Sequence, residues 1–207
     1  MLKVRYRTNE EIWEAADGFR EGEPLIGYTD LPIDTVAISE IVLRLDPIPF
    51  PDLFLKYHID AALTLDMSGI YIDESAYRAI ERPARWRENR LRFSIAHEIG
   101  HYVLHGEEIE RGCFASLEEY IQWMGKRSNP SSPEYQADEF AGRFLIPRDS
   151  LLRYYDRSLE EAAKRNPEWK SDPRLRQALA RKLAPKFGVN YQVIETRFDR
   201  ERIWPVE

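Results

Sequence analysis

Apolar residues recur every four positions in the middle of the chain and predict a long amphipathic helix from Asn89 to His105. The repeat consists of Leu91, Ile95, Ile99 and Val103. Because residues four apart share one face of an α-helix, this stripe would be buried against the rest of the protein. We therefore expect the helix to be part of the core.

A second helix is predicted to begin after Ser132. Serine is a favoured N-cap residue, and Pro133 fits the first helical position, where its missing N–H leaves no hydrogen bond unmade. Pro147 would end the element, because proline cannot continue a helix. The apolar face consists of Ala137, Phe140, Ala141, Phe144 and Leu145. Its small alanines would let this helix approach the first one closely.

The N-terminal part predicts two more helices and a linker. Thr8 and Glu11 form a capping box for a helix that ends near Phe19, and Asp34 to Leu45 has a second helical pattern. Closely spaced prolines then predict a stiff linker before the sheet region. These prolines are Pro47, Pro49 and Pro51.

The segment from Leu55 to Asp73 is rich in β-favouring residues and predicts two strands. They are joined by a tight turn at Asp66 to Gly69. A strand that borders an active-site cleft could bind an extended peptide along its free edge, where backbone hydrogen bonds hold any sequence.

The rest of the chain predicts one long connection and three more helices. Gly112 to Pro133 is the best candidate for a mobile cover. The three helices are Asp149 to Lys164, Pro173 to Phe187 and Tyr191 to Arg200. Many helices with one small sheet indicate an α+β fold.

The composition of the chain indicates an intracellular protein. The chain has 207 residues, of which 43% are hydrophobic, enough to bury a core without disulfides. Its single cysteine, Cys113, can form no internal bridge and suits a reducing compartment. The N-terminus lacks the apolar run of a secretion signal, and no stretch is apolar enough to span a membrane. We expect a cytoplasmic protein.

The charge is unevenly distributed along the chain. The net charge is −6, yet Asp172 to Arg202 contains eight Lys or Arg against four Asp or Glu. These basic residues could form a nucleic-acid-binding face, but solvated helix surfaces explain them equally well. With an acidic chain overall, we do not expect direct nucleic-acid binding.

The segment His97-Glu98-Ile99-Gly100-His101 contains the candidate metal-binding residues. Its two imidazoles lie one turn apart on a predicted helix, so both can reach a single metal ion, for which zinc is the best candidate. Glu98 would not be a ligand. It would act as the general base that takes a proton from the attacking water. This pattern is typical of a metalloprotease.

A hydrolytic zinc site usually has three protein ligands and one open position. A third histidine ligand would require Gly at 104 and His at 107, where the chain has Leu104 and Glu107. His105 lies one turn after His101, but three ligands in a row along one helix would leave the third too far from the ion. We interpret His105 as a helix-end residue near the negative end of the helix dipole.

The better candidate for the third ligand is Glu134, in the first turn of the second helix. Asp138, one turn later, could accept the spare ring N–H of a ligand histidine, as carboxylates beside zinc sites commonly do. Glu139 is the second choice for the ligand. Alternatively, these acids only cover a solvated helix surface.

These segments together resemble the ImmA/IrrE-type zinc metallo-endopeptidases. Arg92 to Glu98 is similar to the family's Arg-Phe-(Ser/Thr)-x-Ala-His-Glu segment. Glu134 to Ala141 is similar to its Glu-x-x-Ala-(Asn/Asp)-x-Phe-Ala motif, and Leu145 to Pro147 to its Leu-Met-Pro ending. The resemblance covers most of the chain in a consistent order.

The resemblance implies a zincin-like catalytic domain over residues 1–147, with a helical subdomain over residues 148–207 packed on it. It supports Zn²⁺ held by His97, His101 and Glu134, with Glu98 as the base. In characterised relatives the substrate is a helix-turn-helix repressor. We therefore expect a zinc endopeptidase that cleaves a cytosolic regulatory protein such as a repressor or an antitoxin.

Two other functions remain open on the sequence alone. A zincin scaffold could bind a repressor or toxin without catalysis, although such a protein would have no use for Glu98. The C-terminal basic helices could instead contact DNA. For the endopeptidase, the donor that stabilises the oxyanion is not identified. The candidates are His58, Arg143, Tyr154 and Tyr155.

Overall fold

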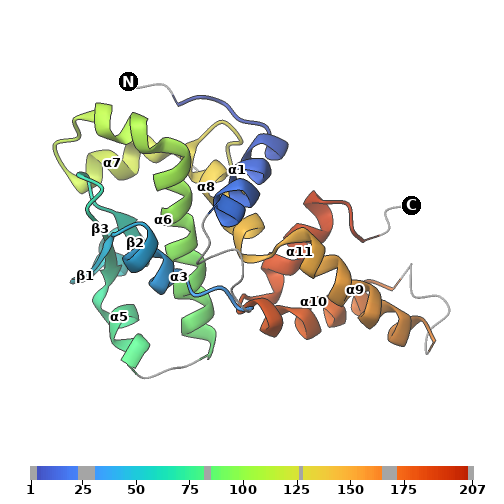
Figure 1. Ribbon diagram of the computed structural model, residues 1–207. Coiled ribbons are helices and arrows are strands. Elements are labelled where there is room, and N and C mark those ends of the chain that lie inside the picture. Colours follow the sequence, from blue (N-terminus) through green and yellow to red (C-terminus); the bar gives the residue numbers. More distant parts are fainter. Residues whose placement is uncertain (1–3, 23–30, 82–84, 126–127, 165–171, 205–207) are drawn as a thin grey trace.

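The computed structural model describes residues 4–22, 31–81, 85–125, 128–164 and 172–204. They form a mixed α+β fold that is mostly helical, with a small sheet beside the long helix α6 (Arg85–Gly112), as Figure 1 shows. The first half contains α1 (Asn9–Gly22), α3 (Thr35–Ala37), η1 (Ile38–Val42), β1 (Asp46–Phe50), α4 (Leu53–Tyr57), β2 (Ala61–Leu63), β3 (Gly69–Asp73) and α5 (Glu74–Glu81). The second half contains α6, α7 (Leu117–Met124), α8 (Pro133–Leu145), α9 (Arg148–Ala163), α10 (Pro173–Phe187) and α11 (Tyr191–Arg200).

Local signals in the sequence set several helix boundaries. The capping box is present: the Thr8 N–H donates to the Glu11 carboxylate at 2.8 Å, and the Glu11 N–H donates to the Thr8 hydroxyl at 3.3 Å. Ser132 caps α8 by accepting the Tyr135 N–H at 3.2 Å, with Pro133 as the first helical residue. Both predicted helix starts are confirmed.

The sheet has the strand order β1-β3-β2, with β1 parallel and β2 antiparallel to β3. Strands β2 and β3 are joined by the predicted turn, in which Asp66 accepts hydrogen bonds from the N–H and hydroxyl of Ser68. The two predicted strands are therefore confirmed. Leu55, where the first was expected to begin, lies in the short helix α4 instead.

The predicted proline linker is wrong, because Asp46–Phe50 is the strand β1. The Asp46 N–H donates to the Ser68 carbonyl at 3.1 Å, so Pro47 and Pro49 occupy the alternate positions, whose nitrogens face away from β3. Proline is tolerated in an edge strand in this way because no ladder hydrogen bond is lost. Gly69 allows the close pairing, since a Cβ there would lie 2.5 Å from the Asp46 carbonyl oxygen.

Helices α6 and α8 pack tightly against each other, and α8 lies between α6 and α1. Helix α6 buries Leu91, Ile95 and Ile99 as predicted, while Val103 is only partly buried. The closest approach is at Gly100, where a Cβ would lie 3.1 Å from the Ala137 carbonyl oxygen. The small residues on both helices thus bring their backbones together.

The segment predicted as a cover contains a packed helix. Within Gly112 to Pro133, helix α7 buries Tyr120 and Met124 against the core, so this part is not an extended loop. Tyr120 and Met124 are four residues apart and therefore lie on one face of α7, which packs against the core.

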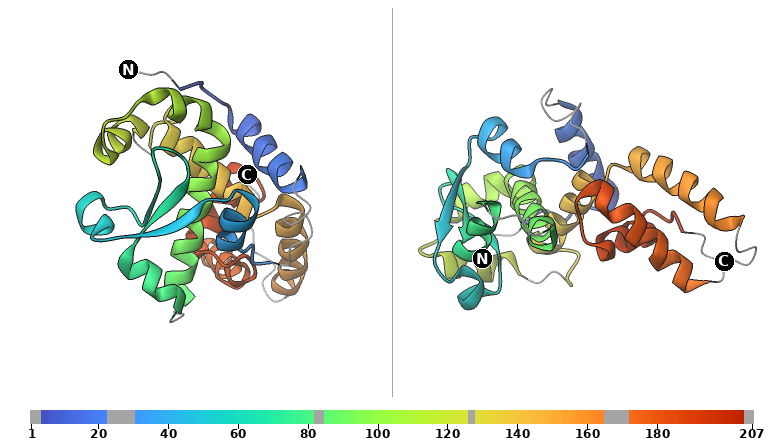
Figure 2. Two further views of the ribbon diagram at one scale, coloured as in Figure 1. Left: turned by 60° about the vertical axis from the view of Figure 1, so that its left-hand side comes forward. Right: turned by 90° about the horizontal axis from the view of Figure 1, so that it is seen from below.

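Helices α9, α10 and α11 gather on the side of the molecule away from the sheet, as Figure 1 and the right-hand view of Figure 2 show. Their bounds lie within one residue of the prediction. Helix α11 buries Ile194 and Phe198 and contacts α8. The division at residues 147 and 148 into two domains stays a prediction. Each helix in the described ranges is too short or too polar to cross a lipid bilayer.

Candidate metal centre

Three predicted ligands converge where α6 meets α8. The Nε2 atoms of His97 and His101 lie 3.0 Å apart, and the Glu134 Oε1 atom lies 3.4 Å from the first and 3.3 Å from the second. The histidines come from adjacent turns of α6, and Glu134 from the first turn of α8. Together, these atoms could hold one metal ion.

The charges around this cluster fit a cation. Burial alone would lower the pKa of His97, but the carboxylates of Glu134 and Asp138 raise it to about 10. Burial alone would raise the pKa of Glu134, but the two histidines hold it far below its usual range. The site therefore favours positive charge between its two buried rings and the carboxylate. Two imidazoles and one carboxylate are a donor set that zinc commonly takes.

Asp138 contacts the ring of His97 on the side away from the cluster. Its Oδ1 atom lies 2.8 Å from His97 Nδ1. A carboxylate only accepts, so it favours a proton on Nδ1 and leaves Nε2 facing Glu134 and His101. Asp138 therefore lies where the predicted supporting residue should lie.

Glu98 lies beside the cluster and is held by the sheet. Its Oε2 atom accepts the backbone N–H of Leu63 in β2 at 2.8 Å. Burial raises the pKa of Glu98, with the nearby Glu134 adding to the rise and the two histidines opposing it. A carboxylate with a raised pKa is suited to taking a proton near neutral pH. No local sequence signal identified Leu63 as its partner.

A cavity of about 240 Å³ opens at the same place. His97, Glu98 and Glu134 line it, and further lining comes from His58 to Ala61, from the N-terminal half of α6, and from Met124, Asn190 and Val193. The cavity gives solvent access to an otherwise buried cluster.

The prediction that His105 ends its helix is wrong, because α6 continues to Gly112. His105 is fully buried, with its Nδ1 atom 3.2 Å from His101 Nδ1 and its Nε2 atom 3.3 Å from the Gln136 side-chain oxygen. Burial lowers its pKa well below the usual value, so the ring is neutral. The spacing of four residues from His101 was visible in the sequence, but Gln136 was not.

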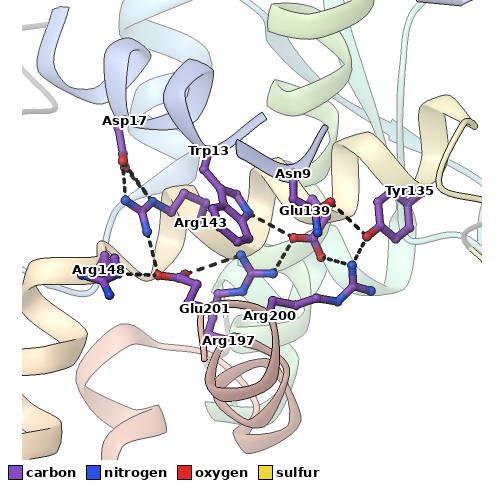
Figure 3. Close-up of polar contacts among 10 residues, drawn as sticks. All are labelled: Asn9, Trp13, Asp17, Tyr135, Glu139, Arg143, Arg148, Arg197, Arg200 and Glu201. Atoms are coloured by element: carbon purple, nitrogen blue, oxygen red, sulfur yellow. Dashed lines mark hydrogen bonds and ion pairs between the residues drawn. The ribbon is translucent and has the colours of Figure 1, made fainter. Parts of the chain in front are cut away.

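Glu139, the second choice for a ligand, faces away from the cluster. Its carboxylate accepts the Trp13 indole N–H at 3.1 Å and pairs with Arg197 at 2.7 Å and Arg200 at 3.3 Å, as Figure 3 shows. It belongs to a buried network that joins α1, α8 and α11. Its role is therefore in packing these helices.

Three of the four candidate oxyanion donors lie elsewhere. Arg143 pairs with Asp17 and Glu201, whereas Tyr154 and Tyr155 pack against Phe187 and Phe198. His58 alone of the four lines the cavity.

The sequence reasoning also missed Tyr120, which is fully buried in α7. Its hydroxyl has no hydrogen-bond partner in the described part of the chain. Its pKa is raised well above the usual value by burial and by the charges of Glu98 and Glu134, so the hydroxyl keeps its proton.

The model of the peptidase M78 family, described as an IrrE N-terminal-like domain, matches residues 83–199. This chain belongs to that family. The match includes the helices that carry His97, His101 and Glu134, and it confirms the resemblance to ImmA/IrrE proteins. The family indicates a metallopeptidase. No curated protein matches the chain.

Proposed function

We propose that this protein is a zinc-dependent endopeptidase, with His97, His101 and Glu134 as ligands and Glu98 as general base. The observation that carries the proposal is the convergence of three donor atoms within 3.4 Å of one another beside a second, buried carboxylate. A purely structural metal site would not need Glu98. The family membership supports the same chemistry.

Zinc, when bound, would acidify water and polarise the scissile carbonyl group. Glu98 would then take the proton of the attacking water and pass it to the leaving amine. The hydrogen bond from the Leu63 N–H fixes Oε2 of Glu98, which leaves Oε1 for the water. Asp138 keeps the proton of His97 on Nδ1, away from the ligand atom.

The edge of β2 is suited to binding the substrate as an extended strand. Thr64 and Asp60 make the backbone bonds to β3, so the polar backbone groups of Ala61 and Leu63 point away from that strand. The Leu63 N–H holds Glu98, and Ala61 lines the cavity. A peptide paired with Ala61 would therefore lie beside the cluster.

The substrate we propose is a cytosolic regulatory protein, either a helix-turn-helix repressor or an antitoxin. An extended or locally unfolded segment of it would enter the cavity, because a folded helix has no free backbone to pair with β2.

The decisive experiment uses Glu98→Gln, which keeps the shape of the side chain but removes the base. The purified protein is incubated with repressors encoded beside its gene, with and without a chelator. We expect cleavage by the zinc-loaded wild type but not by Glu98→Gln, and not when the chelator is present. Glu107→Gln is the matched control, because it makes the same change at an exposed position of α6. Near wild-type cleavage by zinc-loaded Glu98→Gln would refute the mechanism.

Metal content is measured on the same proteins. We expect about one zinc per chain in the wild type and in Glu98→Gln, and loss of the metal in His97→Ala, His101→Ala and Glu134→Ala. Full occupancy in Glu134→Ala would move the third ligand to another residue.

The second candidate function is a non-catalytic protein that binds a repressor or toxin through the same scaffold. It predicts that a cellular phenotype survives Glu98→Gln. Direct DNA binding has less support. Four of the C-terminal basic residues are paired with acids of this chain, namely Arg176 with Asp199, Lys182 with Glu161, and both Arg197 and Arg200 with Glu139.

A further inference from the structure

His101 makes a contact for which a metal site alone does not account. On the side of its ring away from the cluster, His97 faces the Asp138 carboxylate at 2.8 Å, whereas His101 faces the ring of His105 at 3.2 Å. All the side chains concerned, His101, His105 and Gln136, are fully buried. The hydrogen bonds that link His101 to His105, and His105 to Gln136, therefore decide which nitrogen of His101 carries the proton.

Gln136, the residue of this series furthest from His101, sets which groups donate and which accept. The Gln136 side-chain oxygen accepts from the guanidinium of Arg7 at 3.1 Å, and its amide nitrogen donates to the Arg5 carbonyl at 3.1 Å. Arginine can only donate and a carbonyl can only accept, so the amide of Gln136 has one possible orientation. The segment before α1 thus fixes a side chain of α8.

The orientation of the Gln136 amide determines which nitrogen of His105 carries the proton. Its Nε2 atom lies 3.3 Å from the Gln136 oxygen, which accepts, so Nε2 must carry the proton. A second proton on Nδ1 would create a buried cation that has no carboxylate partner among the described residues, and Arg7 binds the same Gln136 oxygen, so this proton is costly. The Nδ1 atom of His105 is therefore an acceptor facing His101.

His101 then has one favourable tautomer. With its proton on Nδ1 it donates to His105, and its Nε2 lone pair points at His97 and Glu134. With its proton on Nε2 it would donate to Glu134, but the lone pairs of His101 and His105 would face each other at 3.2 Å, and two buried acceptors in contact are unfavourable. Without a metal, the free Nε2 atom of the first tautomer faces the Glu134 carboxylate at 3.3 Å in the same way. A cation bound between Nε2 and Glu134 removes that contact, so the metal-bound protein favours the tautomer with its proton on Nδ1.

We propose that Arg7, Gln136 and His105 form a hydrogen-bond relay that holds His101 in the tautomer with a free Nε2 atom and so prepares it to bind the metal. His105 and Gln136 are positioning residues and do not touch the ion. The relay performs for His101 what Asp138 performs for His97, but without adding charge. Arg5 and Arg7, at the end of the relay, lie outside the region matched to the family.

This inference rests on the proposed metal site, but its first test does not depend on catalysis. In the wild-type protein, long-range ¹H–¹⁵N NMR reports which ring nitrogen of each histidine is protonated. We expect a proton on Nε2 of His105 with and without zinc, and a proton on Nδ1 of His101 in the zinc-loaded protein. A proton on His105 Nδ1 in either state, or loss of the His101 Nδ1 proton in the zinc-loaded protein, would overturn the proposal.

The second test substitutes residues of the relay. In His105→Leu, we expect the His101 proton to shift toward Nε2 and zinc affinity, measured against a chelator, to fall about 10- to 100-fold. His105→Asn should restore most of both, because its amide oxygen takes the place of the Nδ1 acceptor. Gln136→Leu gives the same directions and serves if His105→Leu does not fold.

Ile109→Ala is the matched control, since it removes a buried side chain one turn further along α6. It should lower stability without changing the His101 tautomer or the zinc affinity. An unchanged tautomer and affinity in folded His105→Leu would refute the relay. If the wild type binds no zinc at all, the proposed function fails, while the His105 tautomer, measured without zinc, still tests the relay.

Discussion

Glu139 and Arg197 form an ion pair inside the protein, with Oε2 of Glu139 2.7 Å from Nη2 of Arg197. Both side chains are almost completely buried, and the pair joins α8 to α11. Since α8 also carries Glu134, this ion pair anchors one wall of the metal centre to the C-terminal helices. Removing one partner would leave the other as an uncompensated buried charge.

We therefore predict that Glu139→Ala lowers the free energy of unfolding by about 3–5 kcal/mol while zinc still binds at one ion per chain. The Glu161–Lys182 pair at the surface is the control, and Glu161→Ala should cost less than about 1 kcal/mol. Urea unfolding and elemental analysis measure the two effects. Equal losses of stability in both variants would contradict the prediction, and so would loss of zinc from folded Glu139→Ala, because Glu139 would then be needed at the metal centre.

Asp138 supports His97 through a single hydrogen bond of 2.8 Å. We expect Asp138→Ala to weaken zinc binding by about 10- to 100-fold without abolishing it, because the ring loses the acceptor that fixes its tautomer. Asp138→Asn should lose less, since its amide oxygen can still accept. Competition with a chelator of known strength measures both. An unchanged affinity in Asp138→Ala would show that this acid only covers the helix surface.

Gly100 sets the distance between the two helices that supply the ligands. Its Cβ position lies 3.1 Å from the Ala137 carbonyl oxygen and 3.2 Å from the Ala137 Cα atom, so an added methyl group would push α8 and Glu134 away. We predict that Gly100→Ala destabilises the protein by about 1–3 kcal/mol and weakens zinc binding.

Gly106 provides the comparison on the same helix. A methyl group there meets only the Met67 side chain, at 3.7 Å, which is ordinary contact. Gly106→Ala should therefore stabilise the protein by about 0.5–1 kcal/mol through helix propensity alone. If thermal unfolding shows the same gain for both variants, Gly100 is not a point of close contact.

Asp73 makes stability depend on pH at the end of β3. Burial alone would raise its pKa, but the hydroxyl and N–H of Ser75 and the Phe54 N–H donate to its carboxylate and lower the pKa below the usual value. A group whose pKa is lowered by folding stabilises the protein above its unfolded pKa, about 4, and loses that effect as the pH falls through the folded pKa.

The stability difference between the wild type and Asp73→Asn should therefore be largest near neutral pH and should shrink as the pH falls below about 4. Urea unfolding at several pH values measures it. A difference that stays constant over this range would mean that the Asp73 charge contributes nothing.

Much of the local structure could be predicted because its determinants are close together in the sequence. The capping box at Thr8 and the Ser132-Pro133 start of α8 depend on residues three apart. The spacing of His97 and His101 places both rings on one helix face whatever surrounds the helix. The proline-rich strand β1 could not be predicted in this way, because its backbone partners lie more than twenty residues further along the chain.

The sequence by itself therefore determined the kind of chemistry: two imidazoles one turn apart with a carboxylate beside them, and Glu134 at the start of another helix. Only the tertiary structure decided which groups hold these side chains. The Leu63 N–H holds Glu98. His101 is held by His105 and, through it, by Gln136, whereas Glu139 pairs with Arg197 and faces away from the metal centre. Helix periodicity is a property of neighbouring residues, whereas a buried polar group must find a partner that packing brings to it from distant parts of the chain.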